Sequence, residues 1–377
     1  MNSIVRVGMD VHQESIRLAV MAEKVNEIGR GEIIFEDTIA NNLESVRRTF
    51  KRMKKSYPKM ECCYEASGCG FVLQRELATM KIECKVVAPS LIPKSPGDRV
   101  KTDRRDAVKL AKLLWSGQLT YVHIPTKEEE EVRSLVRYRE SKKEDEKRAK
   151  QRILKFLQSR GMKWEGKSNW TQKHRKWLGE LKFAGSEARV FEGLRRDLAH
   201  HSEELKEVDK EIQEIAKRPE YKERVEVLRC LKGVEVLTAM VLLAEIGDCQ
   251  RFPTAQSLMS FLGLTPTEKS SGGMVRRGGI TKSGNKRVRR ILVEAAWHYR
   301  WNTKESMTLR NRRRGQPEWV VEHSRKAQKR LSERFYALSQ RKDRRTTAVA
   351  VARELAGFVW ALQQSREVME NGSMKSE

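Results

Sequence analysis

The chain has 377 residues, and its 77 lysines and arginines against 51 aspartates and glutamates give a net charge of +26. This length predicts two or three domains, and the charge points to a polyanionic partner, most simply nucleic acid. The sequence contains no run of about 18 apolar residues, so we expect no membrane span. Six unevenly placed cysteines do not form a disulfide framework, which favours a reduced, cytoplasmic protein.

The first 126 residues have the pattern of an α/β domain. Short β-rich runs cover residues 4–11, 15–21 and 31–38, and two more cover residues 60–64 and 82–88. Helical spacing predicts helices over residues 41–56 and 68–80, and a third that Thr102 caps and that runs to about residue 116. The order β-β-β-α-β-α-β-α predicts a mixed sheet with helices on it, as in a ribonuclease-H-like fold.

Residues 127–219 have the pattern of long helices. No glycine or proline interrupts residues 127–160, which predicts one long helix, and a linker with four glycines and three tryptophans follows. Apolar residues then recur at heptad spacing from Phe191 to Ile215, which predicts a coiled-coil seam. The two helices form an antiparallel hairpin, a coiled coil between subunits, or both. The three tryptophans (Trp164, Trp170 and Trp177) either anchor packing or stack on bases.

Residues 220–365 predict a third, mainly helical domain, and residues 366–377 a disordered tail. Two helices at residues 225–231 and 236–246 flank a turn at Gly233. This is either an ordinary helical hairpin or a helix-hairpin-helix that holds a backbone phosphate. Further helices are expected at residues 257–262, 285–301, 319–338 and 347–363, and a loop rich in glycine, serine and threonine at residues 265–284.

Four carboxylates of the first domain stand where a metal site is expected. Asp10 ends the first predicted strand and Glu65 ends the fourth, and these strands are neighbours in a ribonuclease-H-like sheet. Asp103 and Asp106 share one helix face at a spacing of three. Four converging carboxylates would bind Mg²⁺, although single surface carboxylates are more often only solvated. His12, two residues after Asp10, either approaches this site or has a structural role at the strand end.

The loop of the third domain is strongly basic and carries two serines. Residues 269–290 hold eight lysines and arginines and no acid, and Ser270 and Ser271 precede a glycine pair. A serine among arginines is suited to attack a phosphodiester, and a basic loop is equally suited to grip a nucleic-acid backbone without reacting. A second basic run (Arg310, Arg312, Arg313 and Arg314) either contacts phosphates or forms a solvated face.

Several segments together resemble the transposases of the IS110 family of insertion sequences, which includes the Piv-type DNA invertases. VGMDVHQESIRLAV, CCYEASGCGF and VKTDRRDAVKLAKLL resemble the three acidic motifs of that family. LKGVEVLTAMVLLAEIGDCQRF, FLGLTPTEKSSGG and GGITKSGNKRVRRILVEAAW resemble its C-terminal domain. The motifs occur at both ends of the chain in the family's order.

This resemblance implies a RuvC-like first domain in which Asp10, Glu65, Asp103 and Asp106 form an Asp-Glu-Asp-Asp cluster for Mg²⁺. It also implies a catalytic serine at Ser271, with Ser270 beside it, that becomes covalently linked to DNA in a composite site often formed between subunits. The implied partners are the DNA of the element ends and target, in some members a guide RNA called a bridge RNA, and further copies of the chain in a dimer or tetramer. The implied location is the cytoplasm, in association with the nucleoid. Our candidates for nucleic-acid contact are Lys269, Arg276, Arg277, Lys282, Lys286 and Arg287.

Two other functions fit parts of the pattern. A RuvC-like nuclease that cuts branched DNA with water needs the four carboxylates and no serine. A protein that only binds nucleic acid needs neither, and its carboxylates would be structural.

Overall fold

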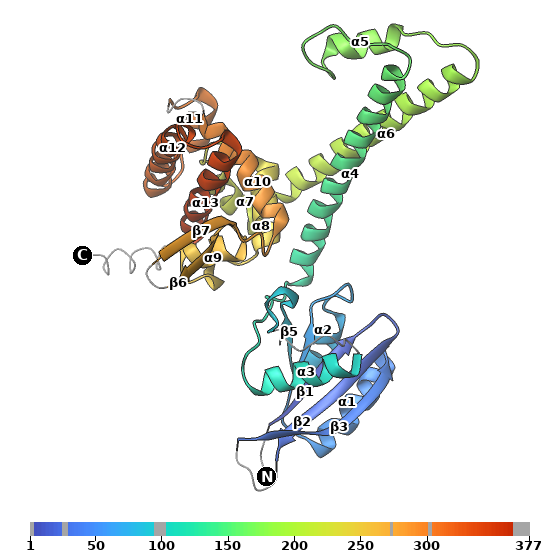
Figure 1. The fold of residues 1–377 in the computed structure, drawn as a ribbon, viewed down its shortest axis with the longest axis vertical. Helices are drawn as coiled ribbons and strands as arrows, with labels where there is room; N and C mark the ends of the chain where they lie inside the picture. The colour runs from blue at the N-terminus through green and yellow to red at the C-terminus, as the bar shows by residue number, and fades with distance from the viewer. Residues whose placement is uncertain (1–3, 25–28, 94–102, 272–273, 301–303, 365–377) are drawn as a thin grey trace. The chain divides into compact units, whose positions relative to one another are not determined.

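The computed structural model describes residues 4–24, 29–93, 103–271, 274–300 and 304–364 of the chain. Thr102, the expected helix cap, and the expected tail at residues 366–377 lie outside these ranges. The chain divides into two compact units, Met1–Pro125 and Thr126–Glu377 (Figure 1). In the described residues no helix is long and apolar enough to cross a lipid bilayer.

A five-stranded sheet forms the centre of the first unit. Its elements are β1 (Val5–Val11), β2 (Ser15–Glu23), β3 (Gly31–Ala40), α1 (Leu43–Ser56), β4 (Met60–Glu65), α2 (Val72–Thr79), β5 (Glu83–Val87) and α3 (Asp103–Trp115). The strand order is β3-β2-β1-β4-β5, in which β1 pairs antiparallel with β2 and parallel with β4. This mixed sheet with helices confirms the predicted α/β pattern, and the neighbouring positions of β1 and β4 are those expected of a ribonuclease-H-like fold.

The two faces of the sheet are covered by different helices because side chains alternate along each strand. Val5, Val7 and Met9 of β1 point into a core with α1 and α2. On the other face, Ala19 and Met21 of β2 pack against Ala107 and Ala111 of α3. The helix predicted at residues 41–56 begins where expected, because the Asn42 side chain caps α1 by accepting a hydrogen bond from the Ser45 backbone. The sheet therefore holds α3 across one face and leaves its first turn near the strand ends.

The second unit contains the long helices and a helical core. Its elements are α4 (Lys127–Gln158), α5 (Gln172–Glu180), α6 (Gly185–Ile215), α7 (Pro219–Leu228), α8 (Val236–Ile246), α9 (Ala255–Phe261), β6 (Pro266–Ser271), β7 (Met274–Ile280), α10 (Lys286–Ala296), α11 (Met307–Arg313), α12 (Glu318–Ser339) and α13 (Arg344–Gln363). Two single turns of 3-10 helix follow α8 and α10, at Cys249–Arg251 and Trp297–Arg300.

Helices α4 and α6 run side by side in opposite directions (Figure 1). Arg139 of α4 pairs with Asp209 of α6, and nearer the far end Arg160 pairs with Glu187. These pairs show the antiparallel arrangement of the predicted helical hairpin within one chain. The segment between the helices, expected as a linker, contains α5. The rings of Trp164, Trp170 and Trp177 each contact the ring of the buried His174 of this helix. These contacts support the packing role for the tryptophans.

The expected loop at residues 265–284 is instead an antiparallel hairpin, and that prediction was wrong. Lys269 pairs with Arg276, Ser270 with Val275 and Ser271 with Met274. The two strands have no regular alternation of apolar side chains, so the strand signal of a half-buried sheet is missing. Pairing between the two backbones, which a local pattern does not report, makes these segments strands.

The turn at Gly233 is part of the core of the second unit. Gly233 has φ +83°, and a Cβ there would lie 2.7 Å from the carbonyl oxygen of Ala295 in α10. Val234 is fully buried beside it. The close contact with α10 supports the ordinary helical hairpin for this segment.

Candidate active site

Asp10 and Glu65 stand at the same edge of the sheet. The ladder between the parallel strands β1 and β4 joins Val5 to Met60 and continues to Met9 and Tyr64, and Asp10 and Glu65 are the next residue of each strand. Parallel strands place their carboxyl ends together. The two carboxylates therefore occupy adjacent positions at the ends of neighbouring strands, as the sequence predicted.

Both residues belong to the face of the sheet that α3 covers. Two positions before Asp10, the backbone of Gly8 contacts α3, and two positions before Glu65, the Cys63 thiol lies 3.7 Å from the Leu110 carbonyl oxygen. The strand alternation of two residues then assigns Asp10 and Glu65 to the same face. Asp103 and Asp106 lie in the first turn of α3, which reaches this edge.

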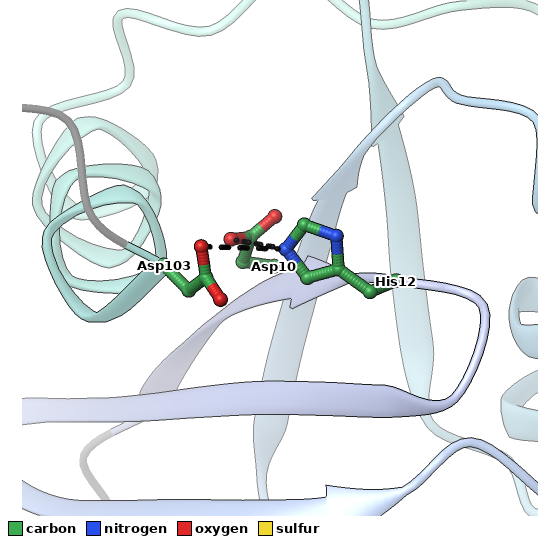
Figure 2. Close-up of side chains that lie close together, drawn as sticks. All are labelled: Asp10, His12 and Asp103. Carbon is green, nitrogen blue, oxygen red and sulfur yellow. Dashed lines mark hydrogen bonds and ion pairs between the residues drawn. The ribbon is translucent and has the colours of Figure 1, made fainter.

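Three ligand atoms converge at this edge (Figure 2). Asp10, His12 and Asp103 each offer one such atom, and these atoms all lie within 4.8 Å of one another. His12 Nε2 lies 3.1 Å from Asp10 Oδ2 and 3.6 Å from Asp103 Oδ1. Glu65, which is exposed, and Asp106 are not part of this group of converging atoms. The donor set of two carboxylates and an imidazole fits a divalent cation.

Other carboxylates lie close enough to Asp10 to affect its pKa. Burial raises the pKa of Asp10, the hydrogen bond and charge of His12 lower it, and the charges of Asp106 and Asp103 raise it again. Asp106 is therefore close enough to act on Asp10 even though it does not join the converging atoms. A bound cation would relieve this repulsion between like charges.

His12 is the residue whose role the sequence left open. It directly follows β1, and its backbone is held from two sides, since His12 N donates to Ser15 O and Asn41 Nδ2 donates to His12 O. These bonds fix the turn between β1 and β2. The His12 ring points toward Asp10 (Figure 2). The spacing of two residues from Asp10 was the only signal in the sequence, because Asp103 comes from a distant segment.

One cation beside the acidic motif of α3, Arg104, has a carboxylate partner outside the site. Arg104 forms a two-pronged ion pair with Glu36 of β3, at 2.7 and 2.8 Å. This pair joins the first turn of α3 to the neighbouring strand of the sheet. Arg104 therefore positions Asp103, its neighbour in the chain, more directly than it serves as a phosphate contact.

The serine hairpin lies in the second unit. Ser271 is the last residue of β6, and Gly272 and Gly273 lie outside the described residues. The Ser270 hydroxyl donates to Glu268 Oε1 at 2.8 Å, and Arg277 Nε donates to Glu268 Oε2 at 3.2 Å. These two hydrogen bonds lower the pKa of Glu268. Ser270 is thus tied to a carboxylate on its own strand.

A buried carboxylate anchors the base of this hairpin to the long helix. Arg137 of α4 holds Glu245 of α8 with two hydrogen bonds of 2.7 and 2.9 Å, and only 1% of the Glu245 side chain is exposed. Asn285 Nδ2 donates to the same carboxylate at 2.8 Å. The Asn285 Oδ1 atom accepts from the backbone of Arg287 and Val288 and so caps α10. The network joins α4, α8 and the residue that ends the hairpin segment.

The predicted nucleic-acid contacts differ in their surroundings. Arg276, Lys282 and Lys286 are exposed, and Lys269 lies opposite Arg276 in the hairpin. Arg277 is engaged by Glu268, and Arg287 by Glu140 of α4 at 2.6 Å. The structure brings Asp10 and Asp103 together with His12, while Ser271 and the basic residues belong to the other unit.

The sequence matches the sequences of known transposases. A family model described as Transposase IS116/IS110/IS902 family matches residues 225–310, and a DEDD-type IS110 transposase model matches residues 7–161. The chain is 38% identical to putative transposase y4qE of Sinorhizobium fredii over 97% of this chain and 90% of that protein. It is 35% identical to the transposase for insertion sequence element IS1533 of Leptospira borgpetersenii over 90% of this chain and 97% of that one.

Proposed function

The chain belongs to the IS116/IS110/IS902 family of insertion-sequence transposases, and from this we propose that it cuts and rejoins DNA through a covalent link between Ser271 and DNA. The observation that carries the metal-dependent part of the proposal is the convergence of Asp10 and Asp103 at one edge of the sheet. We assign Asp10, Glu65, Asp103 and Asp106 as the residues that hold Mg²⁺.

Each group has a defined part in the proposed reaction. Mg²⁺ bound by the carboxylates would polarise the scissile phosphate. The Ser271 hydroxyl releases its proton to water and its oxygen bonds to phosphorus. The bond from phosphorus to the 3′ oxygen breaks, and that oxygen takes up a proton from water and leaves as a 3′-hydroxyl. After strand exchange the 3′-hydroxyl of a partner strand attacks the phosphoserine, which forms a new phosphodiester and frees the serine. The phosphodiester bond between Ser271 and DNA conserves the energy of the broken DNA phosphodiester. Rejoining the strands therefore needs no external energy source.

The basic residues support a role in holding the phosphates. Arg276, Lys282 and Lys286 are exposed beside the hairpin, and their charge is suited to the phosphate backbone. Arg277 would contribute after leaving Glu268, whereas Arg287 is engaged by Glu140 and we assign it to positioning α10. We further propose that the partners are DNA, a guide RNA and other copies of the chain, since exchange of two duplexes needs several serines.

The experiment uses DNA that carries the element ends with their flanks, in the presence of RNA transcribed from the non-coding flanks of the element. Attack with loss of a 3′-hydroxyl leaves the protein on the 5′ phosphate, so the strand downstream of the cut is labelled at its 3′ end. We expect a labelled adduct that survives detergent denaturation, that Ser271→Ala abolishes and that Ser270→Ala retains. Asp10→Asn and removal of divalent cations should each abolish cleavage.

Other outcomes identify the competing functions. Cleavage by Ser271→Ala without an adduct would show a nuclease that uses water. An adduct that requires Ser270 instead would move the nucleophile by one residue. Unchanged activity of Asp10→Asn on DNA would show that the carboxylates are structural, and equal recombination without RNA would remove the guide RNA from the proposal.

A further inference from the structure

A polar groove lies between the C-terminal end of α7 and the short helix α11. It is open to solvent and has a volume of about 690 Å³. Arg229 contributes from the end of α7, Arg312 and Arg314 from the end of α11, and Thr308, Asn311 and Gln316 add hydroxyl and amide groups. None of the lining side chains is aromatic. The groove therefore offers cations and hydrogen-bond donors but no aromatic ring on which a base would stack.

The charge of the groove is positive. Its lining holds three arginines and one acid, Glu226, which is 3 − 1 = +2. Arg312 is engaged by Glu235 and by the Val234 carbonyl oxygen. Arg314 is exposed, and among the described residues neither it nor Arg229 has an acidic partner within ion-pair distance. Two guanidinium groups of this groove are thus available to an anion.

The Arg229 side chain also has a hydrogen-bond donor without an acceptor. Its Nε atom is buried and has no hydrogen-bond partner in the described part of the chain. A buried donor without an acceptor costs about 1–3 kcal/mol. Four arginines of the described residues have such an Nε atom (Arg6, Arg17, Arg229 and Arg251), and of these Arg229 lines the groove. An oxygen-rich anion in the groove would provide acceptors for this guanidinium group.

The wall that presents these arginines is firmly held. Arg313, whose side chain is only 2% exposed, donates to the carbonyl oxygens of Cys230 and Ser324 and pairs with Glu305 at 2.7 Å. These bonds tie α11 to the end of α7 and to α12. The basic run therefore divides by role, with Arg313 inside as an anchor and its two neighbours on the groove.

We propose that this groove binds phosphates of a nucleic-acid backbone at a contact separate from the serine hairpin. Forked guanidinium groups and neutral hydrogen-bond donors suit the non-bridging oxygens of a phosphodiester. Figure 1 shows α11 near one end of the helical core of the second unit and β6 and β7 near the other. The groove therefore holds a segment of nucleic acid away from the cut. The proposal rests on the proposed function only in that the protein handles DNA and RNA.

The test measures binding rather than reaction, and it uses full-length protein with Ser271→Ala in every sample. Binding to labelled duplex DNA and to labelled single-stranded RNA of about 30 nucleotides, both of arbitrary sequence, is followed by fluorescence anisotropy over a series of KCl concentrations. The variants are Arg314→Gln, Arg229→Gln and both together. The matched control is Lys206→Gln with Lys217→Gln. It removes the same charge from two exposed lysines, one in α6 and one just after its end, that pair with neighbouring glutamates.

Loss of two phosphate contacts should flatten the plot of log Kd against log salt by about 1.8 for duplex DNA and about 1.4 for single strands. If the affinities are equal at about 1 M salt, this corresponds at about 0.1 M salt to an affinity roughly 60-fold weaker for duplex DNA and roughly 25-fold weaker for single strands. A change confined to one probe identifies DNA or RNA as the source of the phosphate. The control should change the slope by less than half as much.

Three results would overturn the proposal. The first is a slope for the double variant that matches the control with both probes. The second is binding of neither probe by the parent protein, which would also remove the proposed function. The third applies if circular dichroism shows that the double variant does not fold. In that case Arg314→Gln alone should flatten the slope by about 0.9 with duplex DNA or by about 0.7 with RNA. An unchanged slope for this single variant would overturn the proposal.

Discussion

The backbone of Gly8 lies directly against the backbone of Ala107. A Cβ built at Gly8 would stand 2.2 Å from the Ala107 carbonyl oxygen and 2.3 Å from the Ala111 nitrogen. Asp10 lies two residues after Gly8, and Asp103 and Asp106 lie just before Ala107. The contact therefore sets how far the carboxylates of α3 stand from the carboxylate of β1.

Replacing Gly8 by alanine should push α3 off the sheet. We expect Gly8→Ala to lower the free energy of unfolding by about 1–3 kcal/mol, because both contact atoms are backbone and have little room to move. It should also weaken the binding of Mn²⁺, measured by electron paramagnetic resonance, because Asp103 moves away from Asp10. Gly68→Ala is the control in the same unit, since nothing lies within 4 Å of a Cβ there. Equal thermal stability of the two variants would contradict the contact.

Removal of the His12 imidazole should change which cation the site prefers. His12 Nε2 is one of the three converging atoms, and an imidazole favours Mn²⁺ over Mg²⁺ relative to oxygen ligands alone. We expect His12→Gln to weaken Mn²⁺ binding about tenfold and to change Mg²⁺ binding less. Isothermal titration calorimetry with each metal measures both affinities, and Asp10→Asn should abolish both. An unchanged Mn²⁺ affinity would show that His12 does not bind the metal.

The carboxylate of Glu245 should stabilise the second unit in a way that depends on pH. Burial raises the pKa of Glu245, but the hydrogen bonds from Arg137 and Asn285 and the charges of Arg137 and Arg287 outweigh this effect, so the pKa of Glu245 lies below the usual value of a glutamate. A carboxyl with a lowered pKa stabilises the fold above its unfolded pKa and loses this effect as the pH falls through the folded pKa.

We therefore expect Glu245→Gln to lower the free energy of unfolding by about 1–3 kcal/mol at pH 7. We expect no larger decrease in the free energy of unfolding, because 45% of the Arg137 side chain is exposed and water screens its charge. The difference from the parent protein should shrink as the pH falls below 4.5, which urea denaturation at several pH values measures. A difference that is constant from pH 7 to pH 3 would show that the charge of Glu245 does not contribute.

The base of the serine hairpin should tolerate no side chain at Gly284. This glycine has φ +110°, and a Cβ there would stand 2.0 Å from the carbonyl oxygen of Phe261. We expect Gly284→Ala to lower stability by about 1–3 kcal/mol and to slow formation of the serine adduct by displacing the hairpin. Gly279→Ala is the matched control, because it lies in the same hairpin segment with open space around its Cβ. The comparison of adduct yield in detergent gels tests this, and an equal yield would contradict it.

Local patterns were enough for many elements of this protein. Asn42 and the spacing of the apolar residues after it predicted α1, and uninterrupted helix-forming residues predicted α4. Asp10 and Glu65 were predictable as neighbours because both follow β-rich runs whose order implies parallel pairing. The signals for the two helices come from residues that are close in sequence, because caps and periodicity act locally. The pairing of Asp10 with Glu65 followed instead from the order of the predicted elements, which is that of a ribonuclease-H-like sheet.

The strands β6 and β7 were not predictable, since only pairing between two polar segments defines them. The two roles within the arginine run were also hidden. Arg313 becomes an anchor because Cys230, distant in sequence, presents its carbonyl oxygen there, while Arg314 stays exposed one residue later.

The sequence by itself determined the charge, the α/β and helical parts, the acidic motifs and the family, because these depend on composition and on spacing along the chain. Only the tertiary structure decided that His12 joins Asp10 and Asp103, that Glu245 links α4 to the residue that caps α10, and that Arg229 meets Arg312 and Arg314 in a groove. The reason is physical: each of these groups is completed by residues from distant segments of the chain, and only the packing of the folded chain brings those segments together.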